Sequence, residues 1–145
     1  MANVSTAAAQ WSGDLPTGKG TISLESSHLV TETPYNFKAR AEGSTTVTTP
    51  EELLGAAHAA CFSMAFSLVL GEKNLVPDSI ETQADVTFDI TADGPAITGI
   101  HLTNYSVIPG ISEADFQEVA QAVKLACPVS KALTGVPITL EATLG

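Results

Sequence analysis

Eighteen consecutive residues near the middle of the chain, Leu53 to Leu70, include no Asp, Glu, Lys or Arg. The residues before this run form a strong helix start. Thr49 can cap the helix, Pro50 suits its first position, and Glu52 completes a capping box. Gly71 is a typical helix stop. The sequence therefore predicts one long helix from Pro50 to about Leu70.

This predicted helix is apolar nearly all round, so other parts of the protein must cover it on every side. Eighteen uncharged residues approach the length that spans a membrane. The run is rich in Ala, Gly and Ser, however, and acidic residues lie at both ends. We therefore expect a buried helix of a soluble protein. Its small residues allow close approach of another backbone, and one domain of this size could barely wrap it, which suggests a partner chain.

The length of 145 residues predicts one domain over residues 1–145, with a real core. Six Lys and Arg against sixteen Asp and Glu give a net charge of -10. This balance disfavours nucleic acid and anionic membrane surfaces as partners, because both need a basic surface. The N-terminus shows no secretory signal, so we expect a cytoplasmic protein, in which structural disulfides are uncommon.

The rest of the chain alternates between strand and helix patterns. Strands are expected over 20–26, over 35–41 by period-2 alternation, over 79–91 and 96–109, and over 137–144. A second helix is expected from Ser112 to Ala126, and a short one over 128–133. This order of strands, helix, strands, helices and strand predicts an α+β fold.

The two cysteines occupy distinct settings. Cys61 lies within the long apolar helix, and Cys127 directly precedes Pro128 at the start of the short helix. Thiolate is the reactive form, and burial raises the pKa of Cys61, so Cys61 needs a nearby cation to react. The candidates on the polar face of the preceding strand are Lys38 and Arg40, of which we favour Arg40 for its planar fork. The simpler alternative is two buried, inert thiols.

Glu51 could hold that arginine, but it lies ten residues before Cys61, about 15 Å along a helix. If both serve one site, Glu51 must come from a second subunit. The alternative is an acid that meets the helix dipole in the first turn. His58, three residues before Cys61, could act as a general base or as half of a metal site. The simpler interpretation is a core histidine.

The segment Thr49-Pro50-Glu51-Glu52-Leu53-Leu54-Gly55-Ala56-Ala57-His58-Ala59-Ala60-Cys61-Phe62-Ser63 closely resembles the first cysteine motif of the OsmC/Ohr family. These are the osmotically inducible protein C and organic hydroperoxide resistance proteins. Cys127-Pro128-Val129-Ser130 is similar to the second motif of the family. The resemblance implies an α+β intertwined homodimer, with two long central helices packed against antiparallel β-sheets and active sites at the subunit interface. It also implies that Cys61 is the peroxidatic thiolate, Cys127 the resolving cysteine and Glu51 the catalytic glutamate. Arg40 matches the arginine of the OsmC branch.

The same resemblance implies a peroxidase that reduces organic hydroperoxides, and hydrogen peroxide more weakly. Cys61 would form a sulfenic acid and then a disulfide with Cys127. A dithiol, which the family suggests is a lipoylated protein, would reopen it. No metal or bound organic cofactor is required. We expect an apolar wall around Cys61, including Phe62 and Met64, to favour organic hydroperoxides. Two alternatives remain: a cysteine hydrolase that uses Cys61 with His58, and a non-catalytic redox sensor or small-molecule binding module.

Overall fold

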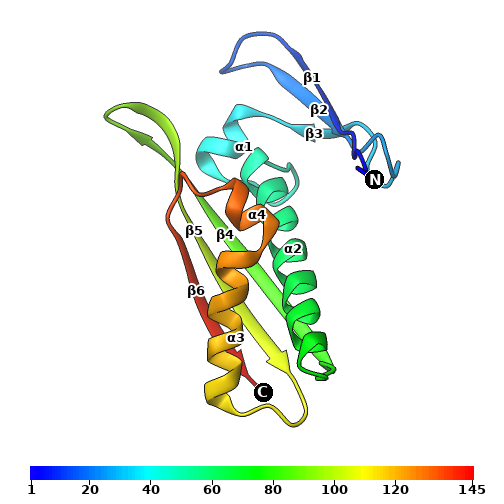
Figure 1. Cartoon of the computed structure of the whole chain (residues 1–145). Coiled ribbons are helices and arrows are strands. Elements are labelled where there is room, and N and C mark those ends of the chain that lie inside the picture. Colours follow the sequence, from blue (N-terminus) through cyan, green and yellow to red (C-terminus); the bar gives the residue numbers. More distant parts are fainter. The chain divides into compact units, whose positions relative to one another are not determined.

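The long apolar run forms one helix, α2, over Pro50–Glu72 in the computed structural model, which describes all residues 1–145. The predicted helix is therefore confirmed, and it continues two residues past Leu70. The chain comprises two units, Met1–Pro50 and Glu51–Gly145. Figure 1 labels the elements of both units. In the first they are β1 (Ala8–Ser12), β2 (Lys19–Ser23), β3 (Thr33–Tyr35) and α1 (Phe37–Glu42). Beyond α2 they are β4 (Ser79–Thr91), β5 (Gly94–Val107), α3 (Glu113–Ala126), α4 (Pro128–Ala132) and β6 (Ile138–Leu144).

The first unit is an antiparallel sheet of order β1-β2-β3, followed by α1. The expected strand over 35–41 is wrong beyond Tyr35, because α1 begins at Phe37. Asn36 caps this helix: its side-chain oxygen accepts the backbone N–H of Ala39 at 2.7 Å. Gly43 ends it with a positive φ of 81°. Arg40 therefore belongs to the last turn of a helix.

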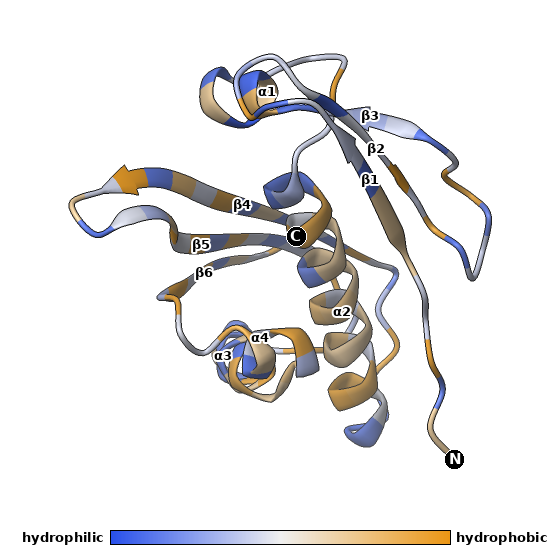
Figure 2. Cartoon of the chain, turned by 90° about the horizontal axis from the view of Figure 1, so that it is seen from above, coloured by the Kyte–Doolittle hydropathy of each residue, from blue (hydrophilic) through white to orange (hydrophobic).

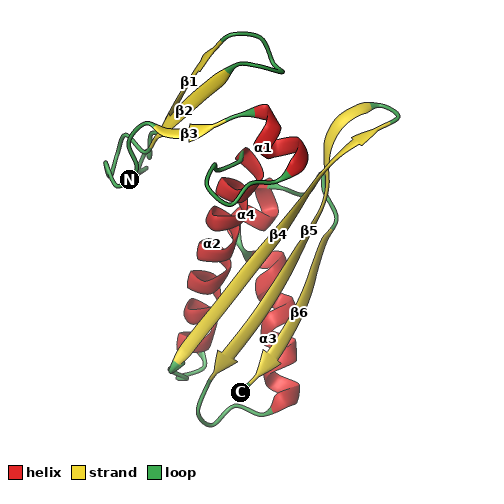
Figure 3. Cartoon of the chain, turned by 180° about the vertical axis from the view of Figure 1, so that it is seen from behind, coloured by secondary structure: helices red, strands yellow, loops and turns green.

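The second unit contains a sheet of order β4-β5-β6, seen from behind in Figure 3. β4 and β5 form an antiparallel hairpin, as expected from the two strand patterns, and its turn is Ala92-Asp93, between the paired residues Thr91 and Gly94. β6 runs parallel to β5, so this sheet is not wholly antiparallel. A parallel pair needs a crossover connection, and α3 and α4 supply it. Ser112 caps α3 through its hydroxyl, which accepts the backbone N–H of Asp115 at 3.2 Å.

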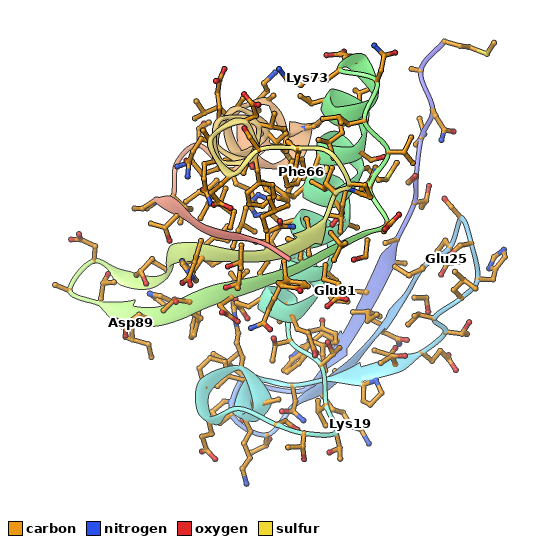
Figure 4. The ribbon with its side chains drawn as sticks, turned by 90° about the horizontal axis from the view of Figure 1, so that it is seen from below. Lys19, Glu25, Phe66, Lys73, Glu81 and Asp89 are labelled. Carbon is orange, nitrogen blue, oxygen red and sulfur yellow. The ribbon has the colours of Figure 1, made fainter.

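The core of the second unit lies between the sheet and the helices α2 and α3, which cover the same face of it (Figures 1 and 3). Phe66 lies in this layer (Figure 4), with its ring centroid 5.8 Å from that of Phe62 and 5.7 Å from that of Phe116. The opposite face of the sheet is polar, and Asp89 projects from it away from the helices (Figure 4). This alternation along the strands places apolar residues inside and charged residues outside.

The chain covers only one side of α2, although the helix is apolar along most of its length (Figure 2). The buried side is formed by Glu51, Gly55, His58, Phe62, Phe66 and Leu70. A second stripe stays exposed and is called here the open stripe: Leu53, Ala56, Ala57, Ala60, Met64, Ser67 and Leu68. The expectation that the helix is covered all round is thus not met by its own chain. By length and composition alone, α2 could cross a membrane, a test that core helices of soluble proteins also pass.

Candidate active site

The fold brings Cys61 and Cys127 together from positions 66 residues apart. Cys61 is half-buried on α2, and Cys127 is fully buried between α3 and α4. The Cys127 side chain lies within hydrogen-bonding reach of the Cys61 sulfur. Both thiols are free, so the structure describes a reduced pair. Two thiols that interact in this way are the arrangement from which a disulfide can form.

The surroundings of Cys61 favour its neutral thiol. Burial is the main cause that raises the pKa of Cys61, and the neighbouring Cys127 raises it further. The backbone N–H of Val129 donates a hydrogen bond to the Cys61 sulfur and lowers the pKa. The net shift is upward, so this single hydrogen bond does not compensate for burial. A reactive Cys61 thiolate therefore needs a further positive partner.

Cys127 is fixed by the junction of two helices. Its backbone N–H donates to the carbonyl of Val123 at 2.9 Å and closes α3. Its own carbonyl accepts the N–H of Lys131 at 3.0 Å and opens α4. Pro128 occupies the first position of α4, where its missing N–H costs nothing. These bonds hold the Cys127 backbone from both sides, which explains why the sequence places proline directly after this cysteine.

Glu51 lies in the first turn of α2 and is buried, with 7% of its surface exposed. It does not join Cys61 within one chain, because both residues belong to the same helix. Their separation of ten residues corresponds to about 15 Å along the axis. The helix geometry argued from the sequence therefore holds in the structure.

Arg40 lies in the first unit and lines a cavity of about 290 Å³ there. Three aromatic side chains, Trp11, Tyr35 and Phe37, form part of its walls. The ring centroids of Trp11 and Tyr35 are 5.5 Å apart. The cavity combines a guanidinium group with apolar walls, a combination that suits a ligand with one polar end and an apolar body.

His58 is fully buried on α2, and its Nε2 is 2.7 Å from the hydroxyl oxygen of Ser130. Its other ring nitrogen, Nδ1, is buried without a hydrogen-bond partner. Burial lowers the pKa of His58, which keeps the ring neutral. Sequence reasoning missed Ser130 as its partner. The available signal was the place of Ser130 in the second cysteine motif, three residues after Cys127.

Two further expectations can be compared with the structure. The bonded nitrogen of His58 faces Ser130, so no hydrogen bond of the kind that a Cys–His hydrolase needs joins it to Cys61. Phe62 is fully buried in the core, so its place in an apolar wall for substrate is wrong. Met64 is 75% exposed on the open stripe. No three His, Cys, Asp or Glu residues lie close enough together to hold a metal ion.

Comparison with known proteins adds independent information. The model of the OsmC-like protein family matches residues 42–141. Peroxiredoxin OsmC of Escherichia coli K12 is 50% identical over 133 residues, which cover 92% of this chain and 91% of that protein. The organic hydroperoxide resistance protein OhrB of Bacillus subtilis is 37% identical over 105 residues, which cover 71% of this chain and 74% of OhrB.

Solved structures agree on the fold. The crystal structure of Bacillus subtilis OhrB superposes with a TM-score of 0.71 at 28% identity, over 95% of this chain and 98% of that one. An OsmC-like protein from Mycoplasma pneumoniae gives a TM-score of 0.75 at 19% identity, over 99% of both chains. The α+β fold expected from the sequence is thus confirmed, and the chain belongs to the OsmC-like protein family.

Proposed function

We propose that this protein is a two-cysteine thiol peroxidase that reduces organic hydroperoxides and, more weakly, hydrogen peroxide. The observation that carries the proposal is the contact between Cys61, half-buried on α2, and Cys127, fully buried at the α3–α4 junction. The names of the relatives, a peroxiredoxin and an organic hydroperoxide resistance protein, support a peroxidase-type role.

The reaction begins at Cys61. Its thiolate attacks the terminal oxygen of the peroxide, the O–O bond breaks, and the alcohol or water leaves after taking up a proton. Cys61 then carries a sulfenic acid. Cys127 attacks the sulfenic sulfur, a disulfide forms, and water leaves. An external dithiol, which we propose is a dihydrolipoyl group on a protein, reopens the disulfide by exchange and is itself oxidised.

Arg40 is proposed to supply the positive partner that Cys61 needs. The upward shift of the Cys61 pKa, caused by burial, supports this requirement. A guanidinium group stabilises a thiolate and can hold the peroxide at the same time, while Glu51 positions the guanidinium. The aromatic walls of the cavity around Arg40 favour an organic hydroperoxide, because they bury its apolar part.

A homodimer with active sites between the subunits is part of the proposal. The open stripe of α2 is apolar and is left uncovered by its own chain. In a helix of ideal geometry Cys61 lies about 80° around the axis from the centre of that stripe, at its border. A second subunit packed on the stripe would therefore reach Cys61. It could supply the glutamate that the same chain cannot bring there. We also propose that residues 1–145 form one functional domain and that the protein is cytoplasmic.

Turnover of cumene hydroperoxide with dihydrolipoamide tests the proposal. We expect rapid turnover by the wild type, none by Cys61→Ser, and one turnover without sustained cycling by Cys127→Ser. Absence of wild-type turnover, or full activity of Cys61→Ser, would exclude a peroxidase. The redox-sensor alternative predicts a disulfide that forms with peroxide but no catalytic cycling with dithiol.

A further inference from the structure

The buried pair of His58 and Ser130 has no part in the chemistry proposed above. Its hydrogen bond, at 2.7 Å, is formed in the interior: His58 is fully buried and Ser130 is 4% exposed. Only one ring nitrogen of His58 is satisfied, since Nδ1 has no partner. A neutral imidazole carries one donor and one acceptor, so one of these two groups is buried without a hydrogen bond.

Such an arrangement costs stability, because a buried polar group without a partner has lost its hydrogen bonds to water. Leucine has a similar size and carries no polar atoms. A leucine at position 58 would fill the space beside the apolar core residues without that cost. Stability therefore does not explain the histidine at this position, and we look for another role for it.

The location of the pair suggests that role. His58 lies about one turn before Cys61 on α2. Ser130 lies in α4, three residues after Cys127, and next to Val129, whose N–H donates to the Cys61 sulfur. The His58–Ser130 bond is a side-chain hydrogen bond that joins α2 to α4. It thus ties the helix that carries one cysteine to the short helix that begins beside the other.

We propose that His58 and Ser130 are positioning residues for the formation of the Cys61–Cys127 disulfide. Their hydrogen bond holds α4 against α2. This keeps Cys127 opposite the Cys61 sulfur and keeps the Val129 N–H in its hydrogen bond to that sulfur. The role rests on the proposed peroxidase function, since it concerns the second step of that reaction. In this step Cys127 attacks the sulfenic sulfur of Cys61, the S–S bond forms, the S–O bond breaks, and the oxygen leaves as water.

α4 is short enough to need this bond. It has five residues. After it, the backbone N–H of Leu133 donates to the carbonyls of Val129 and Ser130 and closes the helix. Isolated helices of this length are unstable, so its position depends on contacts with the core. Val129 and Leu133 supply apolar contacts to the core cluster, and these are not directional. The His58–Ser130 bond adds direction, which a thiol needs to approach a sulfenic sulfur in line.

The experiment measures the rate at which the disulfide forms after a single addition of hydroperoxide, by rapid acid quench and mass spectrometry. The variants are Ser130→Ala, His58→Leu and His58→Gln. Ser63→Ala is the matched control, because it removes another side-chain bond of α2, from Ser63 to Thr82 at 2.8 Å. Thermal denaturation is recorded for each variant. The pH profile of Cys61 alkylation is also recorded, with Cys127→Ser as the background.

We expect disulfide formation to slow by roughly tenfold in Ser130→Ala and His58→Leu, the worth of one buried hydrogen bond. The sulfenic acid then accumulates and is trapped by dimedone. His58→Gln, whose amide can reach the position of Nε2, recovers part of the rate. The alkylation profile of Ser130→Ala shifts to higher pH, as the Val129 N–H bond to Cys61 loosens. His58→Leu melts no lower than the wild type, which separates positioning from stability.

Disulfide formation at the wild-type rate in Ser130→Ala and His58→Leu overturns the proposal, and so does an equal slowing in Ser63→Ala. Should His58→Leu fail to fold, Ser130→Ala decides alone. A wild-type protein in which Cys61 forms no sulfenic acid with hydroperoxide contradicts the proposed function itself. That failure is distinct, because it appears before any variant is compared.

Discussion

Gly55 on α2 lies directly against the backbone of Ala84 on β4: a Cβ at Gly55 would stand 2.9 Å from the Ala84 carbonyl oxygen. This distance is shorter than real Cβ contacts, and backbone cannot give way as a flexible side chain can. Glycine at this position therefore sets how closely the helix approaches the sheet. The approach matters for the proposed function, because the same helix carries Cys61.

Gly55→Ala is expected to lower the free energy of unfolding by about 1–3 kcal/mol through overpacking. Gly71→Ala is the matched control, since it is the same change in the same helix with no atom within 4 Å. Alanine has the higher helix propensity, so this variant should gain up to about 1 kcal/mol. Urea denaturation of both variants measures the difference. Equal stability of the two would contradict the close packing of α2 on β4.

Arg40→Gln is expected to move the alkylation profile of Cys61 to higher pH. Burial already favours the neutral thiol, so thiolate appears only as the pH rises, and loss of the guanidinium delays it further. Peroxide turnover at neutral pH should fall about a hundredfold, as when one oxyanion donor is lost. Lys38→Gln, an equal loss of charge in the same helix, is the control. An unchanged pH profile in Arg40→Gln would show that Arg40 does not stabilise the Cys61 thiolate.

Mixing two inactive variants tests whether Glu51 acts across subunits. The Glu51→Gln and Cys61→Ser variants are unfolded together and refolded, so about half of the proposed dimers should be mixed. If Glu51 serves the Cys61 of the partner subunit, each mixed dimer has one intact site. Activity should then recover to about a quarter of the wild type. If both residues act within one chain, no site is intact and the mixture stays inactive.

Met64→Glu places a charge in the middle of the open stripe and should produce monomers of 15.0 kDa. A buried, unpaired carboxylate opposes the packing of two apolar helices. Leu125→Glu is the control, because Leu125 is similarly exposed, at 71%, but lies on α3. Light scattering after gel filtration gives the mass. A wild type that is already monomeric would contradict the proposed homodimer.

The sequence predicts α2 and the β4–β5 hairpin well because their signals are long or local. Pro50 and the acidic residues after it begin α2, and the short turn Ala92-Asp93 joins the two strands of the hairpin. It predicts α1 wrongly. Over six residues the alternation of Tyr35, Phe37 and Ala39 fits a strand as well as a helix, and the cap by Asn36 decides between them.

For the candidate site, too, the sequence predicts some features and not others. The motifs identify Cys61 and Cys127, and their contact then follows from the crossover that the parallel strand β6 requires. The bond of His58 to Ser130 is not predictable from spacing, because 72 residues separate its partners. Neither is the burial of Phe62, since helix α2 is apolar on nearly every side, and periodicity does not tell which side faces the core.

The placement of Cys127 in the crossover between β5 and β6 also has a consequence for biosynthesis. α2 and the β4–β5 hairpin are made first and involve mostly local contacts, so they can assemble while later residues are still being added. In the proposed mechanism, Cys61 is then without its resolving partner, Cys127, until α3 docks. A peroxide that reaches such a nascent chain leaves a sulfenic acid open to irreversible oxidation. If the protein is the proposed peroxidase, prompt completion of the fold therefore protects Cys61 from the hydroperoxide substrate.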